Sequence, residues 1–172
     1  MRTGLSLFRT VLPFSVLCLS FCLRSQTMPG CQTSELTIDL TSVSDGMGSD
    51  SLGFDLTNKG HRTCSLSGYP SVVALNQRGR IVREIHFQHL TAIPGRADVK
   101  LEEIQLRPGD RAWFEINACH PAGGIDYPFF KKVTELRITP PENNSPFREH
   151  YSFRSCRADV DISFLVAGSA ND

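Results

Sequence analysis

Hydrophobic and polar residues alternate with a period of two in short runs along this chain, and Gly- and Pro-rich turns separate the runs. Leu36, Ile38 and Leu40 alternate with polar residues, and Leu52, Phe54 and Leu56 repeat the pattern. A period of two is typical of a strand that buries one face. No window keeps a helical period over two or three turns. The pattern predicts strands at residues 36–40, 52–56, 72–75, 81–87, 99–106, 112–118, 133–139, 147–156 and 160–166.

Many short strands at near-regular spacing predict an antiparallel sandwich or barrel. A single Trp and the cysteines described below favour the sandwich, so we expect an all-β, immunoglobulin-like antiparallel β-sandwich of one domain. Because successive side chains of a strand face opposite ways, we expect one of Trp113 and Phe114 inside and the other outside. For Trp113, packing in the core is favoured over a ligand platform. A bulge is expected at Glu102 and Glu103, on an exposed edge.

The N-terminal segment has the pattern of a secretory signal peptide. Arg2 and Arg9 precede the apolar run of residues 10–23, and the run ends at Arg24 and Ser25. The run is shorter than the roughly 20 residues of a membrane span, which makes an uncleaved anchor the second interpretation. We expect residues 1–25 to be a signal peptide and residues 26–172 to be a β-sandwich domain with its core in residues 31–166. Lipidation of Cys22 is disfavoured because Phe21 precedes it.

Cleavage after Ser25 removes three of the 18 Lys and Arg and none of the 18 Asp and Glu, which leaves a net charge near −3. No basic patch of the kind that binds nucleic acid is visible. We therefore expect no nucleic-acid partner, and a membrane contact only through an uncleaved leader or lipidation. The location predicted is the periplasm or the extracellular space.

Four cysteines follow the leader, namely Cys31, Cys64, Cys119 and Cys156. An even number in an exported chain indicates two disulfides. Of the three ways to pair four cysteines, we favour Cys31 with Cys64 and Cys119 with Cys156, because each pair joins neighbouring parts of the chain. The alternatives are free buried cysteines and, more weakly, a metal site, for which the chain lacks a Cys-x-x-Cys pair.

The element after Cys64 has the chemistry of a turn. Gly68 can adopt a positive φ, and Pro70 favours an extended Tyr69. We expect Tyr69 to cover the core with its ring and to hydrogen-bond through its hydroxyl group. Asn58 is predicted to occupy a left-handed turn position. These four residues are interpreted as structural.

The arrangement Leu56-Thr57-Asn58, followed by Thr63-Cys64-Ser65-Leu66-Ser67-Gly68-Tyr69-Pro70, resembles the signature of a bacterial secreted family, domain of unknown function 4232. Cys31 matches the cysteine that opens the family's domain. Later parts of the pattern are matched by the Pro108-Gly109 turn, Cys119, the Leu136-Arg137-Ile138 strand with its Pro140-Pro141 stop, and Cys156. The resemblance covers residues 31–166. It implies an exported sandwich domain and brings no activity.

Two sets of residues are candidates for a site. Tyr127, Phe129 and Phe130 could form an exposed apolar patch that contacts a protein or the envelope. The favoured alternative is a loop that buries these side chains over the end of the core. His86, His89 and His120 could assemble a metal or hydrolytic site, although His86 and His89 would face opposite ways on a strand. We expect no catalytic residue, cofactor or metal. The function predicted is a non-catalytic binding or interaction module with an unknown protein or envelope partner. The alternative is a metal-binding protein or a hydrolytic enzyme built on those histidines.

The two disulfides are predicted to act on stability alone. A loop of 30 to 40 residues closed by a disulfide contributes about 3.5 to 4 kcal/mol in the chain-entropy treatment. Cys64→Ser should therefore lower both the melting temperature and the secreted yield. An unchanged melting temperature and yield would contradict this role.

Overall fold

The computed structural model describes residues 28–46, 48–119 and 132–171. The predicted signal peptide, His120 and the patch of Tyr127, Phe129 and Phe130 lie outside these residues. The described chain is all-β, with one short 3₁₀ helix, η1 (Thr33–Glu35). Within the described ranges no helix has the length and apolar character needed to cross a bilayer.

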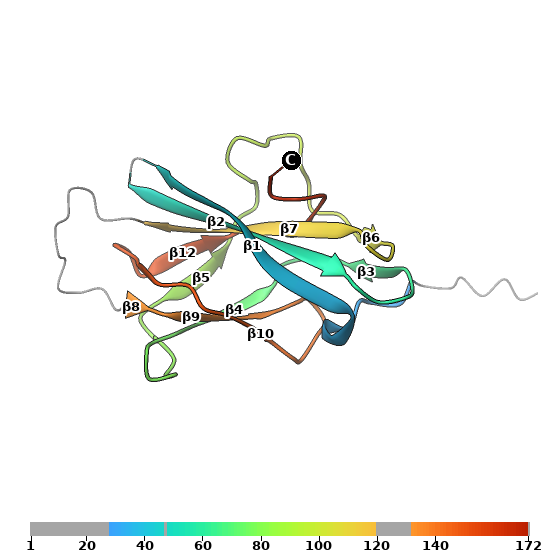
Figure 1. The fold of residues 1–172 in the computed structure, drawn as a ribbon. Coiled ribbons are helices and arrows are strands. Elements are labelled where there is room, and N and C mark those ends of the chain that lie inside the picture. The colour runs from blue at the N-terminus through green and yellow to red at the C-terminus, as the bar shows by residue number, and fades with distance from the viewer. Residues whose placement is uncertain (1–27, 47, 120–131, 172) are drawn as a thin grey trace, which may run out of the picture.

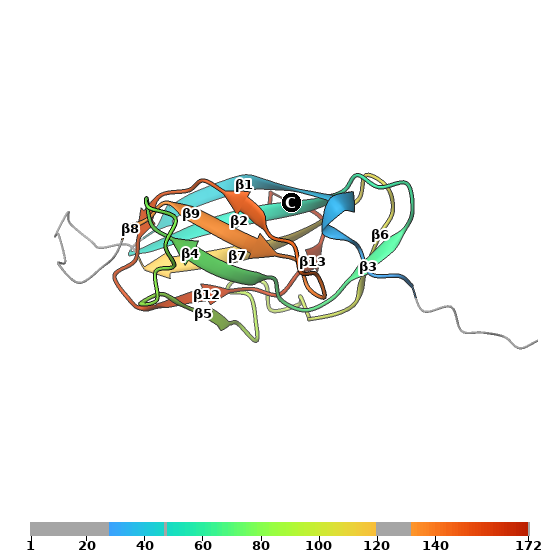
Figure 2. The ribbon, with the colours of Figure 1, turned by 90° about the horizontal axis from the view of Figure 1, so that it is seen from below.

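The strands form two larger sheets and two small ones. The six-stranded sheet has the order β1-β2-β7-β12-β5, with β13 also paired to β7. Its members are β1 (Leu36–Gly46), β2 (Ser49–Asn58), β5 (His86–His89), β7 (Arg111–Cys119), β12 (Asp159–Ile162) and β13 (Val166–Ala167). The three-stranded sheet has the order β10-β9-β4 and contains β4 (Ser71–Leu75), β9 (Glu135–Thr139) and β10 (Phe147–Glu149). Figure 1 shows this smaller sheet below the larger one, and Figure 2 shows it in front.

The two small sheets lie at opposite ends of the molecule (Figure 1). One pairs β3 (Cys64–Leu66) with β6 (Ile104–Leu106), and the other pairs β8 (Lys132–Val133) with β11 (Phe153–Arg154). Each end also carries a disulfide. Cys31–Cys64 joins the first described residues to β3, and Cys119–Cys156 joins the end of β7 to the segment after β11, with Cα–Cα distances of 4.8 and 5.1 Å. This is the pairing favoured from the sequence.

The expected antiparallel arrangement is wrong at one edge of the larger sheet. β5 pairs with β12 in parallel, with His86 opposite Asp159 and His89 opposite Ile162, so the sheet is mixed. Between β5 and β12 the chain forms β7 of the same sheet and then β9 and β10 of the other sheet, and this long connection lets β5 and β12 run in the same direction.

Two predicted strands are also shorter than expected. Residues 81–87 do not form a hairpin with β4 beyond one bridge, between Leu75 and Ile81, because the chain turns away to join the larger sheet as β5. Residues 99–103 form no strand at all, so the bulge expected at Glu102 and Glu103 is absent and β6 begins only at Ile104.

The main core lies between the two larger sheets. Leu52, Phe54 and Leu56 of β2 point into it and are fully buried, as their alternation predicted. Phe54 stacks on Phe114 of the neighbouring strand, with ring centroids 5.3 Å apart. Leu136 and Ile138 enter the same cluster from β9. The core therefore contains side chains from both sheets.

A second hydrophobic cluster covers the opposite face of the larger sheet. Trp113 is 1% exposed there and packs with Ile93 and Phe164. The expectation that one of Trp113 and Phe114 would lie outside is therefore wrong, since both are buried, on opposite faces of β7. The connection between β5 and β6 and the C-terminal segment cover this face, where Figure 1 shows them above the larger sheet.

Asp55 fixes the C-terminal segment onto this same face of the larger sheet. Its carboxylate, which is 1% exposed, accepts hydrogen bonds from the Ser169 hydroxyl at 2.6 Å, the Ala170 amide at 2.9 Å and the Thr41 hydroxyl at 3.2 Å. A buried carboxylate is tolerated only when such donors replace water. The Asp55 carboxylate thus joins β1, β2 and the end of the described chain.

Asn58 holds two turns together at the β3–β6 end. Its side-chain amide donates to the carbonyl groups of Arg62 and Leu106, both at 2.9 Å, and its side-chain oxygen accepts from the Gly60 amide. The left-handed conformation predicted for Asn58 is wrong, because among the described non-glycine residues only Glu142 has a positive φ. The position requires asparagine because its side chain supplies both the donor and the acceptor of these three hydrogen bonds.

Asn58→Ala should lower the free energy of unfolding by about 3 kcal/mol, because three hydrogen bonds of a buried side chain are lost together. Urea denaturation of the disulfide-intact protein measures this change. Asn144→Ala, at an exposed asparagine, is the matched control and should change stability little. Equal stabilities for the two variants would contradict the role given to Asn58.

Candidate functional site

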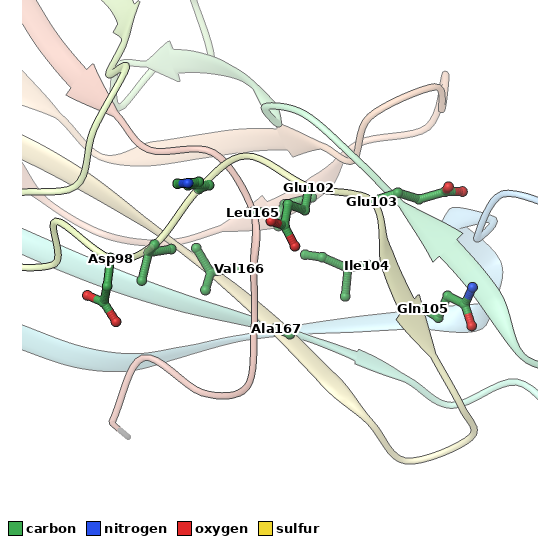
Figure 3. A pocket seen from close by; sticks show the side chains of 10 residues that line it. Asp98, Glu102, Glu103, Ile104, Gln105, Leu165, Val166 and Ala167 are labelled. Carbon is green, nitrogen blue, oxygen red and sulfur yellow. The ribbon is translucent and has the colours of Figure 1, made fainter.

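A hollow opens at the edge of the larger sheet, between an irregular segment and the strand nearest the C-terminus (Figure 3). One wall consists of residues 98–100 and 102–105, and the other of residues 165–167. The cavity volume is about 360 Å³. We call this hollow the edge groove, and residues 98–103, which form no strand, the strap.

The wall at residues 165–167 continues β12 after a one-residue bulge. The Ser163 amide donates a hydrogen bond to the carbonyl of Glu115, and Val166 lies opposite Trp113. Two residues, Phe164 and Leu165, therefore lie opposite the single residue Phe114 of β7. The extra residue shifts the alternation by one position, so that Ile162 and Leu165, three residues apart, both enter the main core, while Phe164 enters the Trp113 cluster. This bulge sets the position of β13 and therefore of the groove wall.

The signature element found in the sequence supports this wall from behind. The carbonyl of Gly68 accepts a hydrogen bond from the Leu165 amide at 2.9 Å. Gly68 has a φ of 95°, the left-handed conformation predicted for it. The ring of Tyr69 meets that of Phe164 edge to face, with centroids 6.1 Å apart. Gly68 and Tyr69 thus fix Phe164 and Leu165, the two residues of the bulge.

Tyr69 also fixes the start of the connection between β5 and β6. Its hydroxyl donates to the carbonyl of Leu90 at 2.7 Å, and its ring stacks on that of His89 with centroids 4.0 Å apart. Pro70, the next residue, is buried. The ring of Tyr69 therefore contributes to the second cluster, and its hydroxyl group holds the connection in place.

The strap crosses the edge of the sheet. On the covered face, the guanidinium carbon of Arg96 lies 4.5 Å from the centroid of the Trp113 ring, a cation–π contact. Arg96 lies just before the strap, and Ile104, directly after the strap, is buried in the main core. A segment that joins the two faces must pass around the edge of the sheet, and it does so opposite β13, leaving the edge groove between them.

The groove combines an apolar base with acidic sides. Val99 and Val166 pack against the Trp113 cluster, and Ile104 and Leu165 belong to the main core. Of the charged lining residues, Asp98, Glu102 and Glu103 are acids and Lys100 is the base. In Figure 3 the Glu102 side chain lies over the groove and that of Glu103 extends away from it.

Glu115 lies on the covered face beside Trp113. Burial raises the pKa of its carboxyl group, while the charge of Arg96 and a hydrogen bond with Asn117 act in the opposite direction. The ionised form of Glu115 is therefore less favourable in the folded protein than in the unfolded chain.

The histidines are not brought together by the fold as far as it is described. His86 and His89 are exposed on β5, at the edge of the sheet, and His120 lies outside the described residues. Among residues 28–46, 48–119 and 132–171, no group of three or more His, Cys, Asp or Glu side chains is arranged to hold a metal ion.

Two further hollows lie beside the turn after β4. They share Asn76 and Lys132 and are also lined by Arg78 and Arg80. Their cavity volumes are about 270 and 320 Å³. The oxygen of the Asn76 side chain accepts hydrogen bonds from the amides of Arg78 and Arg80, which hold this turn. The charged residues that line these two hollows are mostly basic, whereas those of the edge groove are mostly acidic.

The edge groove was not predicted from the sequence. Its strap was expected to be a bulged strand. The bulge at Phe164 and Leu165 lies in a continuous apolar run, Phe164-Leu165-Val166, in which a shift of the alternation cannot be read. The available signal was the pair Glu102 and Glu103, whose charges interrupt the alternation at the point where the strand is missing.

The molecule is a disulfide-linked, all-β domain with a groove at an open sheet edge. The chain belongs to the family described as Domain of unknown function (DUF4232), which matches residues 31–163. The resemblance to this family stated from the sequence is confirmed.

Comparison with curated proteins gives no match. Among solved structures, the "Crystal structure of Se-Met labeled Beta-glucosidase from Kluyveromyces marxianus" is similar over 70% of this chain and 14% of that chain, at 12% identity and a TM-score of 0.29. A likeness at this level carries no argument about fold or function.

Glu115→Gln should increase the free energy of unfolding at pH 7, because it removes a partly buried charge that is disfavoured in the folded state. The sign follows from the raised pKa: the wild type gains stability as the pH falls through the folded pKa of Glu115 towards its unfolded value, and the variant lacks this gain. Urea denaturation between pH 4 and 7 measures it. Glu84→Gln, at an exposed site, should keep the wild-type pH profile, and a Glu115→Gln profile equal to it would contradict the effect.

Proposed function

We propose that this chain is an exported, non-catalytic binding module that contacts a protein partner of the cell envelope or secreted space. We infer that its two larger sheets form an immunoglobulin-like β-sandwich, which holds the binding surface rigidly. The single observation that carries the proposal is the edge groove, an open hollow with an apolar base and acidic sides.

Export is supported by the chemistry of the cysteines. Disulfides persist in oxidising compartments and are rare in the cytosol, so two of them fit a periplasmic or secreted protein. The basic and apolar pattern of residues 1–25 supports the same location.

Binding at the groove is supported by the exposure of the strap. Leu101 is 47% exposed and stands between two residues that line the groove, Lys100 and Glu102. Exposed apolar side chains beside a preformed hollow are typical of recognition surfaces, and loops on a rigid scaffold commonly carry binding residues.

A photo-crosslinking amino acid at position 101 tests the proposal. The same group at positions 43 and 81 provides matched controls, because Val43 and Ile81 are also exposed apolar residues, 49% and 58%, and lie outside the edge groove. Incubated with exported and envelope fractions of the native host, position 101 should give a discrete adduct with one protein that the two controls do not give. Absence of an adduct at position 101, or equal adducts at all three positions, would overturn the proposed function.

A further inference from the structure

The larger sheet has a vacant position along one part of its edge. β5 covers the outer edge of β12 as far as Ile162, whose carbonyl accepts the Leu90 amide at 2.9 Å. After Leu90 the chain leaves the edge to form the connection that covers Trp113. The Leu165 amide next bonds to the carbonyl of Gly68, and β13 (Val166–Ala167) is then paired with β7 on one side and, within the described residues, with no strand on the other.

The backbone of β13 has hydrogen-bonding groups directed towards this vacant position. The Gly168 amide donates to the carbonyl of Arg111, and in an antiparallel pair such bonded residues alternate with non-bonded ones. Ala167 is therefore in a non-bonded pair with Ala112, and its N–H and C=O groups face away from β7. No hydrogen bond joins these two groups to another described residue.

The edge groove lies along this vacant edge. Residues 165–167 form one of its walls, and the strap on the other side leaves a cavity of about 360 Å³ between them. The Leu165 amide is already bonded to Gly68, so the wall is held in an extended conformation before any partner arrives. A preformed sheet edge of this kind binds an extended peptide through main-chain hydrogen bonds, while adjacent side chains select its sequence.

The charges around the groove indicate which peptide fits. The carboxylates of Asp98 and Glu102, with that of Glu103 directed away from the groove, outnumber the single ammonium group of Lys100. A segment with Lys or Arg beside small apolar residues would complement the acidic sides and the apolar base of Val99 and Val166. An acidic segment would be repelled.

We propose that the edge groove binds an extended, basic segment of an exported protein partner, which adds a short strand beside β13 in the position that β5 leaves vacant. This inference rests on the proposed function and specifies the partner of the same groove. The added strand bonds with the N–H and C=O groups of Ala167, next to the point where the Gly68 carbonyl already accepts the Leu165 amide.

Selection of displayed random heptapeptides on the disulfide-intact protein tests this inference. The peptides enriched should carry Lys or Arg and lack acidic residues and central proline, because a strand that pairs needs its amides. Binding of each synthetic peptide can be followed by the fluorescence of Trp113, the only Trp of the chain, which packs in the cluster below the groove.

Changes in the peptide and in the protein separate strand addition from other modes of binding. Methylation of alternate backbone nitrogens of the peptide should weaken binding about tenfold or more, since it removes donors and leaves the side chains unchanged. On the protein, Ala167→Pro removes an N–H that β7 does not use, and E102K reverses a charge at the groove; each should weaken binding to a similar extent. E84K, a charge reversal at an exposed acid that lies outside the groove, should leave it unchanged.

Several outcomes would overturn the inference. They are a selection that yields no binder, enriched peptides that are acidic, and binding that survives both N-methylation and E102K. The N-methylated peptides are tested on the wild-type protein, so this result does not depend on any variant folding. If a protein adduct forms at position 101 and any of these outcomes is also found, the proposed binding function stands and the added strand is rejected. Concentration-dependent dimers that Ala167→Pro abolishes would instead identify a second copy of the chain as the occupant.

Discussion

The burial of β7 on both faces is the constraint on which the rest of this structure depends. Phe114 and Ile116 point into the core between the two larger sheets, while Trp113 points into a separate cluster on the other face. A strand in this position cannot leave either face to water, so the chain must supply a cover on each side. The second cover is made from the connection after β5 and the C-terminal segment, and it is this cover that brings the strap to the edge of the sheet.

Alternation in the sequence predicted the strands that bury one face against the main core. Leu52, Phe54 and Leu56 are in this class, and so are Leu136 and Ile138. Alternation could not predict the second cluster, because Ile93 and Phe164 come from irregular segments and meet Trp113 only in the folded chain. It also could not predict the parallel pairing of β5 with β12, which depends on the path of the chain between them.

Several residues that suggested the family have structural roles. Asn58 joins two turns, and Gly68 and Tyr69 hold the bulge from which β13 emerges. The sequence predicted that these residues were structural, and the hydroxyl bond of Tyr69 was anticipated. What they support could not be predicted, since Gly68 and Leu165 are close in space and distant in sequence.

The two walls of the edge groove differ in how much change they can absorb. In the wall at residues 165–167, deletion of one residue would turn every following side chain to the opposite face and would separate Ser169 from Asp55. The strap has no strand register to keep, since its residues are irregular and mostly exposed. Insertions and substitutions there cost little, because a surface loop is lengthened at a small entropic penalty. For the peptide proposed above, the fixed wall would preserve the way the peptide is held, and changes in the strap would alter which peptide is chosen.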